Sequence, residues 1–373
     1  MAGHEFRTVI QHDQSGDLGD AAPGPTQRLS RQWLRADLKD DRDGFRRWLS
    51  DEDDQARVAI QRPLFVPVSG APQDSNGLDS ADPALADLRA RRDTTKGRGI
   101  RIGIADTGIR SHKWLNGSFF ALPIDWEPLD VDGDDLLDPQ AGHGLFVAGL
   151  ILQQAPGAYL HVARSLSPLG SGDTDEVMLD VLRLVNEDVH VLNLSLGTYA
   201  DGDPHYETAW RKIIETALGL NPDLVIVCPA GNLEDNREVG SRFYPGAIDN
   251  DNVISVAALD KNRSTRVAEF SNVGDWVDFA APGEDLLSTY LRWIPPVGGP
   301  AYHGYAYWSG TSFATAVVTG AIAACMSAGG TAKQAVEKLK KTDQQASGPY
   351  RLPIVGLDDW AIPRLPTPGP SPE

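Results

Sequence analysis

The turn and helix from Gly310 to Gly320 place a serine where a nucleophile could act. The run Gly-Thr-Ser-Phe-Ala-Thr-Ala-Val-Val-Thr-Gly leads from small residues into an apolar helix, so we expect the Ser312 hydroxyl to project from the turn. Free backbone N–H groups at a helix start stabilise the negative charge that forms during acyl transfer. Gly-Thr-Ser is also an ordinary helix cap, and this stretch alone does not separate the two interpretations.

An attacking serine needs a base, an acid that orients the base, and a donor to the oxyanion. Asp106 ends a short apolar strand that begins near Ile100, and His143 stands at the entrance of an apolar helix. Asn232 follows a second buried strand and carries an amide that can donate a hydrogen bond. Each has a simpler explanation, since histidines cap helices and asparagines form turns. The chain order Asp, His, Asn, Ser, however, contains the order Asp, His, Ser of subtilisin.

Nine short motifs make this resemblance specific, and the chain resembles the subtilisin-like serine proteases, the subtilases, from about residue 97 to 345. The motifs are Ile104–Gly108, Gly142–Gly149, Asn193–Gly197, Ala230–Asn232, Tyr244–Pro245, Val253–Ala258, Phe270–Gly274, Ala280–Gly283 and Gly310–Ala314. The resemblance implies an α/β fold of three layers, with a mostly parallel central sheet and helices on both faces. The alternation of β-branched strands and amphipathic helices after Gly99 indicates the same arrangement. In this family Ser312 would be the nucleophile, His143 the base, Asp106 its orienting acid and Asn232 the oxyanion donor.

The resemblance also implies where a peptide substrate would bind. Ser195, Leu196 and Gly197 follow a strand and should offer a free edge, to which an extended peptide adds as another strand. Ala230 and Gly231 precede the expected oxyanion donor, and the glycine permits a close approach of the substrate. A protein or peptide is therefore the expected partner.

Phe243 and the following Tyr244–Pro245 belong to the expected specificity pocket. The family has a cis peptide bond at the position of Tyr244–Pro245, and we predict one here. Many relatives have glycine at the pocket floor, where this chain has Phe243. A ring there would shrink the pocket and favour a small or medium residue before the scissile bond. The alternative is that Phe243 turns into the core and leaves the pocket open.

Several residues of this chain depart from the family pattern. Phe313 stands in place of the methionine that usually follows the nucleophile, so the site lacks a thioether that could be oxidised. Phe146 replaces a second histidine, and Ala316 and Val317 replace a proline and a histidine. These are packing and support positions, so they bear on catalytic efficiency rather than on the identity of the reaction.

The expected chemistry requires no cofactor. The loop after the catalytic-histidine helix is too short for the calcium-binding insertion of extracellular relatives. An acidic loop with Asp130, Asp132 and Asp134, followed by Asp135 and Asp138, offers oxygen ligands for a structural calcium ion. Counted from Asp130, however, an EF-hand loop needs glycine where Asp135 stands and glutamate where Ala141 stands. A solvated acidic loop is the favoured interpretation.

Composition excludes several kinds of partner and predicts a location. The net charge of -18 in 373 residues argues against nucleic acid and anionic membranes, which reward basic patches. The first thirty residues carry charges throughout and lack the apolar core of a signal peptide, and no apolar run is long enough for a membrane span. Cys228 and Cys325 are expected as reduced core thiols. Together these features predict a cytoplasmic protein.

The chain divides into five predicted segments. We expect an irregular lead at 1–28, a small accessory or propeptide-like segment at 29–68, a linker at 69–96, the catalytic domain at 97–350, and a Pro-rich tail at 351–373, in which Ile354–Leu357 could still pack on the core. The accessory segment is expected either to be removed or to pack permanently on the catalytic domain.

Two other functions are compatible with parts of this pattern, and a third is excluded. A catalytically silent peptide-binding domain would keep the fold and the substrate edge, although the chain retains all the polar groups expected of an active endopeptidase. A transpeptidase or macrocyclase would use the same groups with an amine in place of water. A dinucleotide-binding domain is excluded, because the first turn lacks Gly-x-Gly-x-x-Gly.

Overall fold

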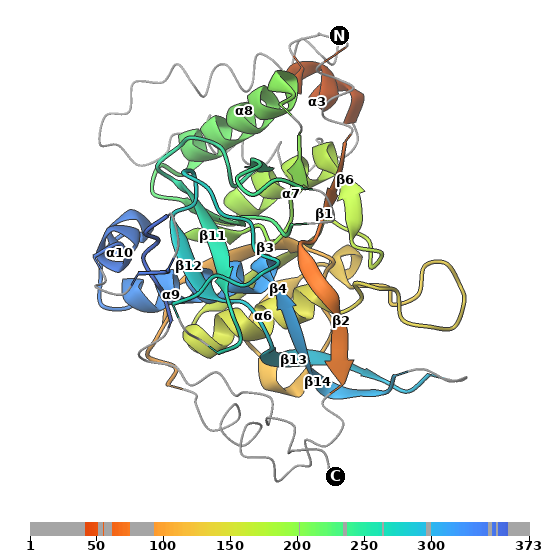
Figure 1. The fold of residues 1–373 in the computed structure, drawn as a ribbon. Helices are drawn as coiled ribbons and strands as arrows, with labels where there is room; N and C mark the ends of the chain where they lie inside the picture. The colour runs from red at the N-terminus through yellow and green to blue at the C-terminus, as the bar shows by residue number, and fades with distance from the viewer. Residues whose placement is uncertain are drawn as a thin grey trace.

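The computed structural model describes residues 42–50, 55, 62–74, 93–200, 202–233, 237–262, 265–295, 300–341, 345–347 and 350–356 (Figure 1). The helices are α3 (Arg42–Leu49), α6 (His143–Gln154), α7 (Thr174–Val185), α8 (Pro204–Leu220), α9 (Thr311–Met326) and α10 (Ala332–Leu339), with short 3-10 turns η1 (Lys113–Leu115) and η2 (Pro123–Asp125). The central strands are β3 (Arg101–Asp106), β4 (Phe119–Ala121), β5 (Tyr159–Arg164), β7 (Val191–Asn193), β9 (Val225–Pro229), β11 (Val253–Leu259) and β12 (Phe279–Pro282).

These central strands form one parallel sheet in the order β12-β11-β9-β7-β3-β5-β4. Strand β9 is a continuous apolar run, β11 is apolar apart from Ser255, and every residue in both is buried. Such runs are typical of parallel strands that helices cover on both faces. Asp106 is the last residue of β3, and Asn232 follows the end of β9, so both lie at the carboxyl edge where ligands bind in sheets of this kind.

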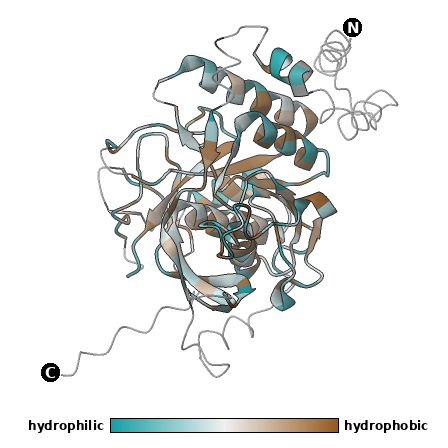
Figure 2. Cartoon of the chain, turned by 90° about the vertical axis from the view of Figure 1, so that its right-hand side faces the viewer, coloured by the Kyte–Doolittle hydropathy of each residue, from teal (hydrophilic) through white to brown (hydrophobic). Residues whose placement is uncertain are grey.

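Helices form a layer on each face of the sheet (Figure 1). Helices α6 and α9 contribute side chains to one hydrophobic cluster, and α7 and α8 to a second cluster on the other face. Nearly all of α9 is buried because it is apolar all round, whereas α7 and α8 keep polar faces outward. In Figure 2 the brown, apolar segments lie inside and the teal segments lie at the periphery. The predicted three-layer α/β fold is confirmed.

Three smaller sheets surround the central one. Strand β1 (Pro63–Phe65) pairs with β6 (Ser171–Asp173), and β8 (Thr198–Tyr199) pairs with β10 (Phe243–Tyr244). The third sheet has the order β13-β14-β2, from Leu286–Trp293, Tyr302–Gly310 and Val68–Asp74. All pairs in these sheets are antiparallel. Strand β14 leads directly into α9, so the third sheet lies next to the turn that carries Ser312.

The N-terminal segment packs on the domain, and the predicted linker boundary is wrong. Phe45, Trp48 and Leu49 recur at near-helical spacing in the sequence, which predicts a helix with one apolar face. In α3 these three side chains are buried in the cluster shared with α7 and α8. The predicted linker at 69–96, however, begins inside strand β2. Its polar sequence is compatible with a strand because β2 lies at the edge of its sheet. The sequence Val58-Ala59-Ile60, for which a short strand is also expected from its apolar, β-branched residues, lies outside the described residues.

The predicted start of the C-terminal tail is also too early. Ile354 forms a parallel bridge with Ala280 of β12, and the side chains of Ile354 and Val355 are 4% and 3% exposed. The packed domain therefore extends to residue 356. The expectation that Ile354–Leu357 packs on the core is confirmed for Ile354 and Val355. Residues 357–373 lie outside the described part of the chain.

Candidate active site

Asp106 and His143 meet at the carboxyl end of β3. His143 is the first residue of α6, and its Nδ1 donates to Oδ1 of Asp106 at 2.7 Å. The Thr107 backbone N–H donates to the same oxygen, also at 2.7 Å. Both side chains are fully buried. A carboxylate held this way fixes the tautomer and the direction of the imidazole and leaves Nε2 available on the far side of the ring.

Two glycines allow α6 to approach β3 this closely. Gly142 has a φ of +85°, and a side chain there would strike the ring of Tyr290. A Cβ atom at Gly144 would lie 2.2 Å from the carbonyl oxygen of Gly108. Only glycine fits both positions, which explains the Gly-His-Gly sequence around the imidazole.

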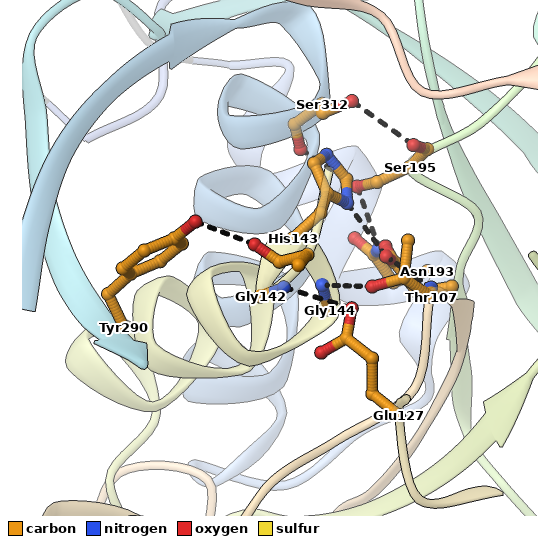
Figure 3. A network of polar contacts seen from close by, with 11 residues as sticks. Thr107, Glu127, Gly142, His143, Gly144, Asn193, Ser195, Tyr290 and Ser312 are labelled. Atoms are coloured by element: carbon orange, nitrogen blue, oxygen red, sulfur yellow. Dashed lines mark hydrogen bonds and ion pairs between the residues drawn. The ribbon is translucent and has the colours of Figure 1, made fainter. Parts of the chain in front are cut away.

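Glu127 joins the start of α6 to the end of β3, a role that the sequence analysis missed (Figure 3). Its Oε1 accepts from the Gly142 N–H at 2.9 Å, and Thr107, which also bonds to Glu127, accepts from the Gly144 N–H at 3.1 Å. Burial raises the pKa of Glu127 to about 8, and the charge of Asp106 acts in the same direction, while the Thr107 and Gly142 bonds oppose the shift. No periodicity or motif marks this glutamate in the sequence.

Ser312 lies in the first turn of α9 and is hydrogen-bonded to Ser195, two residues after the end of β7. Its Oγ donates to the Ser195 carbonyl at 3.1 Å, and the Ser195 hydroxyl donates to the Ser312 carbonyl at 2.8 Å (Figure 3). Asn193 Nδ2 donates to the Ser195 hydroxyl, and Thr319 of α9 donates to Asn193 Oδ1 at 2.8 Å. These bonds fix α9 relative to the Ser195–Gly197 edge.

The side-chain amide of Asn232 is oriented by Thr311. Its Oδ1 accepts from the Thr311 N–H at 3.1 Å and from the Thr311 hydroxyl at 2.8 Å. This fixes Nδ2 on the opposite side of the amide, where it has no hydrogen-bond partner among the described residues. The structure thus brings Asp106, His143, Asn232 and Ser312, which are distant in sequence, to one edge of the sheet.

The departures from the family pattern pack against one another around His143. The rings of Phe146 and Phe313 have centroids 4.5 Å apart, and the Phe313 ring lies 5.3 Å from that of His143. Trp308 completes the group at 5.7 Å from His143. Two phenylalanines therefore fill a volume that elsewhere in the family holds a histidine and a methionine.

The Phe243 ring lies close to both Gly197 and Gly231, two residues of the expected substrate site. A Cβ atom on Gly197 would lie 2.3 Å from the Phe243 ring, and one on Gly231 would lie 2.6 Å from it. The ring also packs edge-on against Tyr199, with centroids 4.9 Å apart. The Tyr244–Pro245 bond is cis, as predicted. Ala230 is buried beside Gly231, at the end of β9.

The acidic loop could hold a cation with a set of carboxylates slightly different from the predicted one. Asp130, Asp132 and Asp138 each bring an oxygen to within 4.8 Å of the others, whereas Asp134 is not part of this group. Burial raises the pKa of Asp138, and the nearby charges of Asp132, Asp130 and Asp134 add to this shift. Several of these carboxylates accept backbone N–H groups of their own loop, such as that of Gly133 by Asp130.

The parallel α/β sheet and the meeting of an acid, an imidazole and a helix-borne serine at its edge define a subtilisin-type protein. A sequence model of the subtilase family matches residues 97–348. The chain belongs to the subtilase family of serine proteases. Within the described residues, no helix has both the length and the apolar character needed to cross a membrane.

Among known proteins, the chain is 33% identical over 245 residues to an intracellular serine protease of Paenibacillus polymyxa, a match that covers 61% of this chain and 67% of that protein. It is 31% identical over 274 residues to a thermophilic serine proteinase of Bacillus sp. (strain AK1), covering 69% of this chain and 59% of that protein. Subtilisin Savinase of Lederbergia lenta is 32% identical over 236 residues, a match that covers 61% of this chain and 76% of that protein.

Two solved structures have the same fold. A cold adapted subtilisin-like serine proteinase aligns with a TM-score of 0.50 at 25% identity and covers 67% of this chain and 84% of its own. A lanthipeptide protease aligns with a TM-score of 0.58 at 22% identity, and the alignment covers 78% of this chain and 96% of that protein. At this identity the likeness supports the fold and nothing further.

Proposed function

We propose that this protein is a serine endopeptidase in which Asp106, His143 and Ser312 form the catalytic triad. The observation that carries the proposal is the buried 2.7 Å bond from His143 to Asp106, beside a serine in the first turn of α9. Ser312 attacks a peptide carbonyl carbon, and Nε2 of His143 takes the hydroxyl proton and later gives it to the leaving amine. Asp106 holds the imidazole. Nδ2 of Asn232 and the Ser312 N–H bind the oxyanion. These steps need no cofactor.

We further propose that the protein acts in the cytoplasm on a dedicated protein or precursor peptide. The name of the intracellular relative supports this location. The Ser195–Gly197 edge would receive the substrate as an added strand, since the edge already pairs with an extended segment.

Mass spectrometry of a denatured protein mixture treated with wild type or with Ser312→Ala tests this function. Cleavage products should form with the wild type and be absent with the variant. A fluorophosphonate probe should label Ser312 of the folded wild type. Absence of both products and labelling, in protein of native circular dichroism, would instead support a catalytically silent peptide-binding domain.

We also propose that the protein prefers a small or medium residue before the scissile bond. It is supported by the position of the Phe243 ring, which is 4% exposed and fills the space between Gly197 and Gly231. In a peptide library, Phe243→Ala should raise cleavage after Phe and Tyr by at least about tenfold, because a deeper pocket gains apolar contact. Strong cleavage after Phe or Tyr by the wild type would contradict the proposal.

A further inference from the structure

The peptide unit between Ala141 and Gly142, directly before His143, is held at both of its polar ends (Figure 3). The Gly142 N–H donates to Oε1 of Glu127 at 2.9 Å, and the Ala141 carbonyl accepts from the Tyr290 hydroxyl at 2.7 Å. Glu127 lies in a loop and Tyr290 in β13, so two separate parts of the fold grip the same unit. The unit cannot rotate without breaking one of these bonds, which fixes the direction in which His143 leaves the backbone.

Helix α6 needs these outside partners because its N-cap residue is a glycine. The first N–H groups of a helix have no partner within it, and the N-cap side chain usually accepts one of them. Gly142 has no side chain, and a Cβ atom there would collide with the Tyr290 ring. The Gly144 N–H donates instead to Oγ1 of Thr107 at 3.1 Å, and Thr107 also bonds to Glu127. The start of α6 is therefore capped by residues outside the helix.

The same contacts join the two members of the Asp106–His143 pair. Thr107 directly follows Asp106, and its N–H donates to the Asp106 oxygen that also accepts from His143. Glu127 is thus bonded to the residue after the acid and to the residue before the base. Its side chain is fully buried, so without it the buried Gly142 N–H would have no acceptor. An unsatisfied buried donor is costly enough to displace the local backbone.

The surroundings of Glu127 favour a neutral carboxyl group. Its Oε2 has no hydrogen-bond partner among the described residues, and Arg110 donates to the backbone carbonyl of Glu127, at 3.0 Å. Burial raises the pKa of Glu127 to about 8, and the charge of Asp106 acts in the same direction. Tyr290 of β13 also keeps its proton, because burial raises its pKa well above the usual value. On α6 the nearby titratable group is His143, whose Nδ1 is bonded to Asp106.

We propose that Glu127 is a positioning residue of the active site, which as a neutral acid holds the peptide unit before His143 and thereby directs the imidazole toward Asp106. This inference rests on the proposed endopeptidase function and deepens it, because it adds a residue that sets the rate without touching the substrate. A displacement of about 1 Å at a reacting group can lower the rate by about 10²-fold. The effect belongs in kcat rather than in KM.

Glu127→Met and Glu127→Gln separate the hydrogen bond from the charge. Methionine has a similar length and no oxygen to accept from Gly142, whereas glutamine keeps a carbonyl acceptor and cannot ionise. At about pH 7, below the pKa of Glu127, Glu127→Met should lower kcat by about 10²-fold with KM within about twofold. Glu127→Gln should recover most of this loss and lie at least about tenfold above Glu127→Met. Glu337→Met, at an exposed position of α10, is the matched control and should keep the wild-type kcat.

Proton NMR of the His143 Nδ1–H measures the positioning directly and does not depend on hydrolysis. A short N–H···O bond to a carboxylate moves the resonance of this proton far downfield. The downfield resonance should be present in the parent and in Glu127→Gln, and shifted upfield or lost in Glu127→Met. Its absence in His143→Ala assigns it. All of these proteins carry Ser312→Ala to prevent autolysis.

Wild-type kcat and an unchanged resonance in Glu127→Met would overturn the inference. A loss in Glu127→Gln equal to that in Glu127→Met would overturn the neutral form, because it would mean that an ionised carboxylate is required. If the wild type hydrolyses no peptide, the endopeptidase function fails, and the NMR comparison still decides whether Glu127 positions the imidazole.

Tyr290→Phe tests the same peptide unit if Glu127→Met lacks native circular dichroism. It removes the bond to the Ala141 carbonyl and keeps the ring that packs on Gly142. It should lower kcat by about tenfold, as expected for the loss of one hydrogen bond, and shift the His143 resonance upfield. Unchanged kcat and resonance in this variant would mean that the peptide unit does not direct the imidazole, and would overturn the inference.

Discussion

His143 is enclosed by a carboxylate on one side and by aromatic rings on the other. Its Nδ1 lies 2.7 Å from Oδ1 of Asp106. The ring centroids of Phe313 and Trp308 lie 5.3 and 5.7 Å from that of His143. Aromatic walls keep water from the imidazole, which strengthens its hydrogen bond to the carboxylate. The pairing of Phe146 with Phe313 therefore helps to hold the His143 ring in place, and substitution of either phenylalanine should change the orientation of the imidazole.

Asn232 offers a prediction at the same scale. Replacing it with alanine should lower kcat by about 10²- to 10³-fold with little change in KM, because the lost donor acts on the oxyanion and not on the bound peptide. Steady-state kinetics on one peptide measures both constants. Asn116→Ala, in an exposed turn after η1, is the control and should retain wild-type rates. A variant that changes only KM would contradict the role of Asn232 as an oxyanion donor.

The raised pKa of Glu127 leads to a prediction of how the free energy of unfolding depends on pH. The folded protein keeps this proton to about pH 8, whereas an unfolded glutamate releases it near 4.5, so the free energy of unfolding falls as pH rises between these values. The variant Glu127→Gln has no carboxyl group at this position, so its free energy of unfolding should fall less with rising pH, by on the order of 3 to 5 kcal/mol. Denaturant unfolding at pH 5 and pH 8, in a Ser312→Ala background to prevent autolysis, measures it.

The control for this experiment is Glu238→Gln, at an exposed position. It should show the same pH dependence as the parent. An equal pH dependence in Glu127→Gln and the parent would mean that Glu127 is ionised in the folded protein at neutral pH.

At the scale of elements, the position of α6 depends on its contact with β13. Gly149 lies where the two elements touch, and a Cβ atom there would lie 2.3 Å from the hydroxyl oxygens of both Ser288 and Thr289. These hydroxyls already donate to carbonyls of α6, at Phe146 and Leu145. The helix that begins with His143 is thus fixed along its length as well as at its start.

Gly149→Ala should lower the free energy of unfolding by about 1 to 3 kcal/mol, since the crowding outweighs the roughly 1 kcal/mol gain in helix propensity. It should also lower kcat, because α6 carries His143. Gly219→Ala in α8 is a matched control, as nothing lies within 4 Å of its added Cβ. The control should be neutral or stabilised. If both variants gain stability, the α6 contact with β13 is less tight than the distances indicate.

Several strands of the central sheet, and the helices that cover it, were predictable because each of them has a local signal. Strand β9 is a continuous apolar run, and α9 is apolar for several turns, so burial on both sides follows from the residues themselves. Strand β2 has no such signal. It exists because its backbone pairs with β14, more than two hundred residues away, and the sequence Val-Ser-Gly-Ala-Pro-Gln-Asp does not encode that partner.

The candidate site divides in the same way. Asp106, His143, Asn232 and Ser312 follow strands or begin helices, so the parallel sheet itself brings them together. Glu127 and the bond from Thr319 to Asn193 depend on side chains that meet only after the layers have packed. The hydrogen bond from the Ser312 N–H to the Pro67 carbonyl also joins residues that are far apart in the sequence, and composition gives no indication of it.

The whole molecule extends beyond the part that matches the family, and its last described residues support the site. The family match ends at residue 348, whereas Ile354 packs with Ala280 and with Ala230, two residues before Asn232, in one buried cluster. The Ala280 N–H donates to Pro353 at 3.0 Å, and the Val355 N–H donates to Ala280 at 2.9 Å. The C-terminal segment thus covers the edge of the sheet at β12.

Ile354→Ala should therefore lower the free energy of unfolding by about 2 to 5 kcal/mol, the range for a buried isoleucine whose surroundings relax only in part. Val239→Ala, at a side chain that is 62% exposed, should change it by less than about 0.5 kcal/mol. Urea unfolding of both variants in the Ser312→Ala background compares them directly. If Ile354→Ala unfolds at the urea concentration of the control, residues 350–356 are not part of the cooperative unit, and the domain ends where the family match ends.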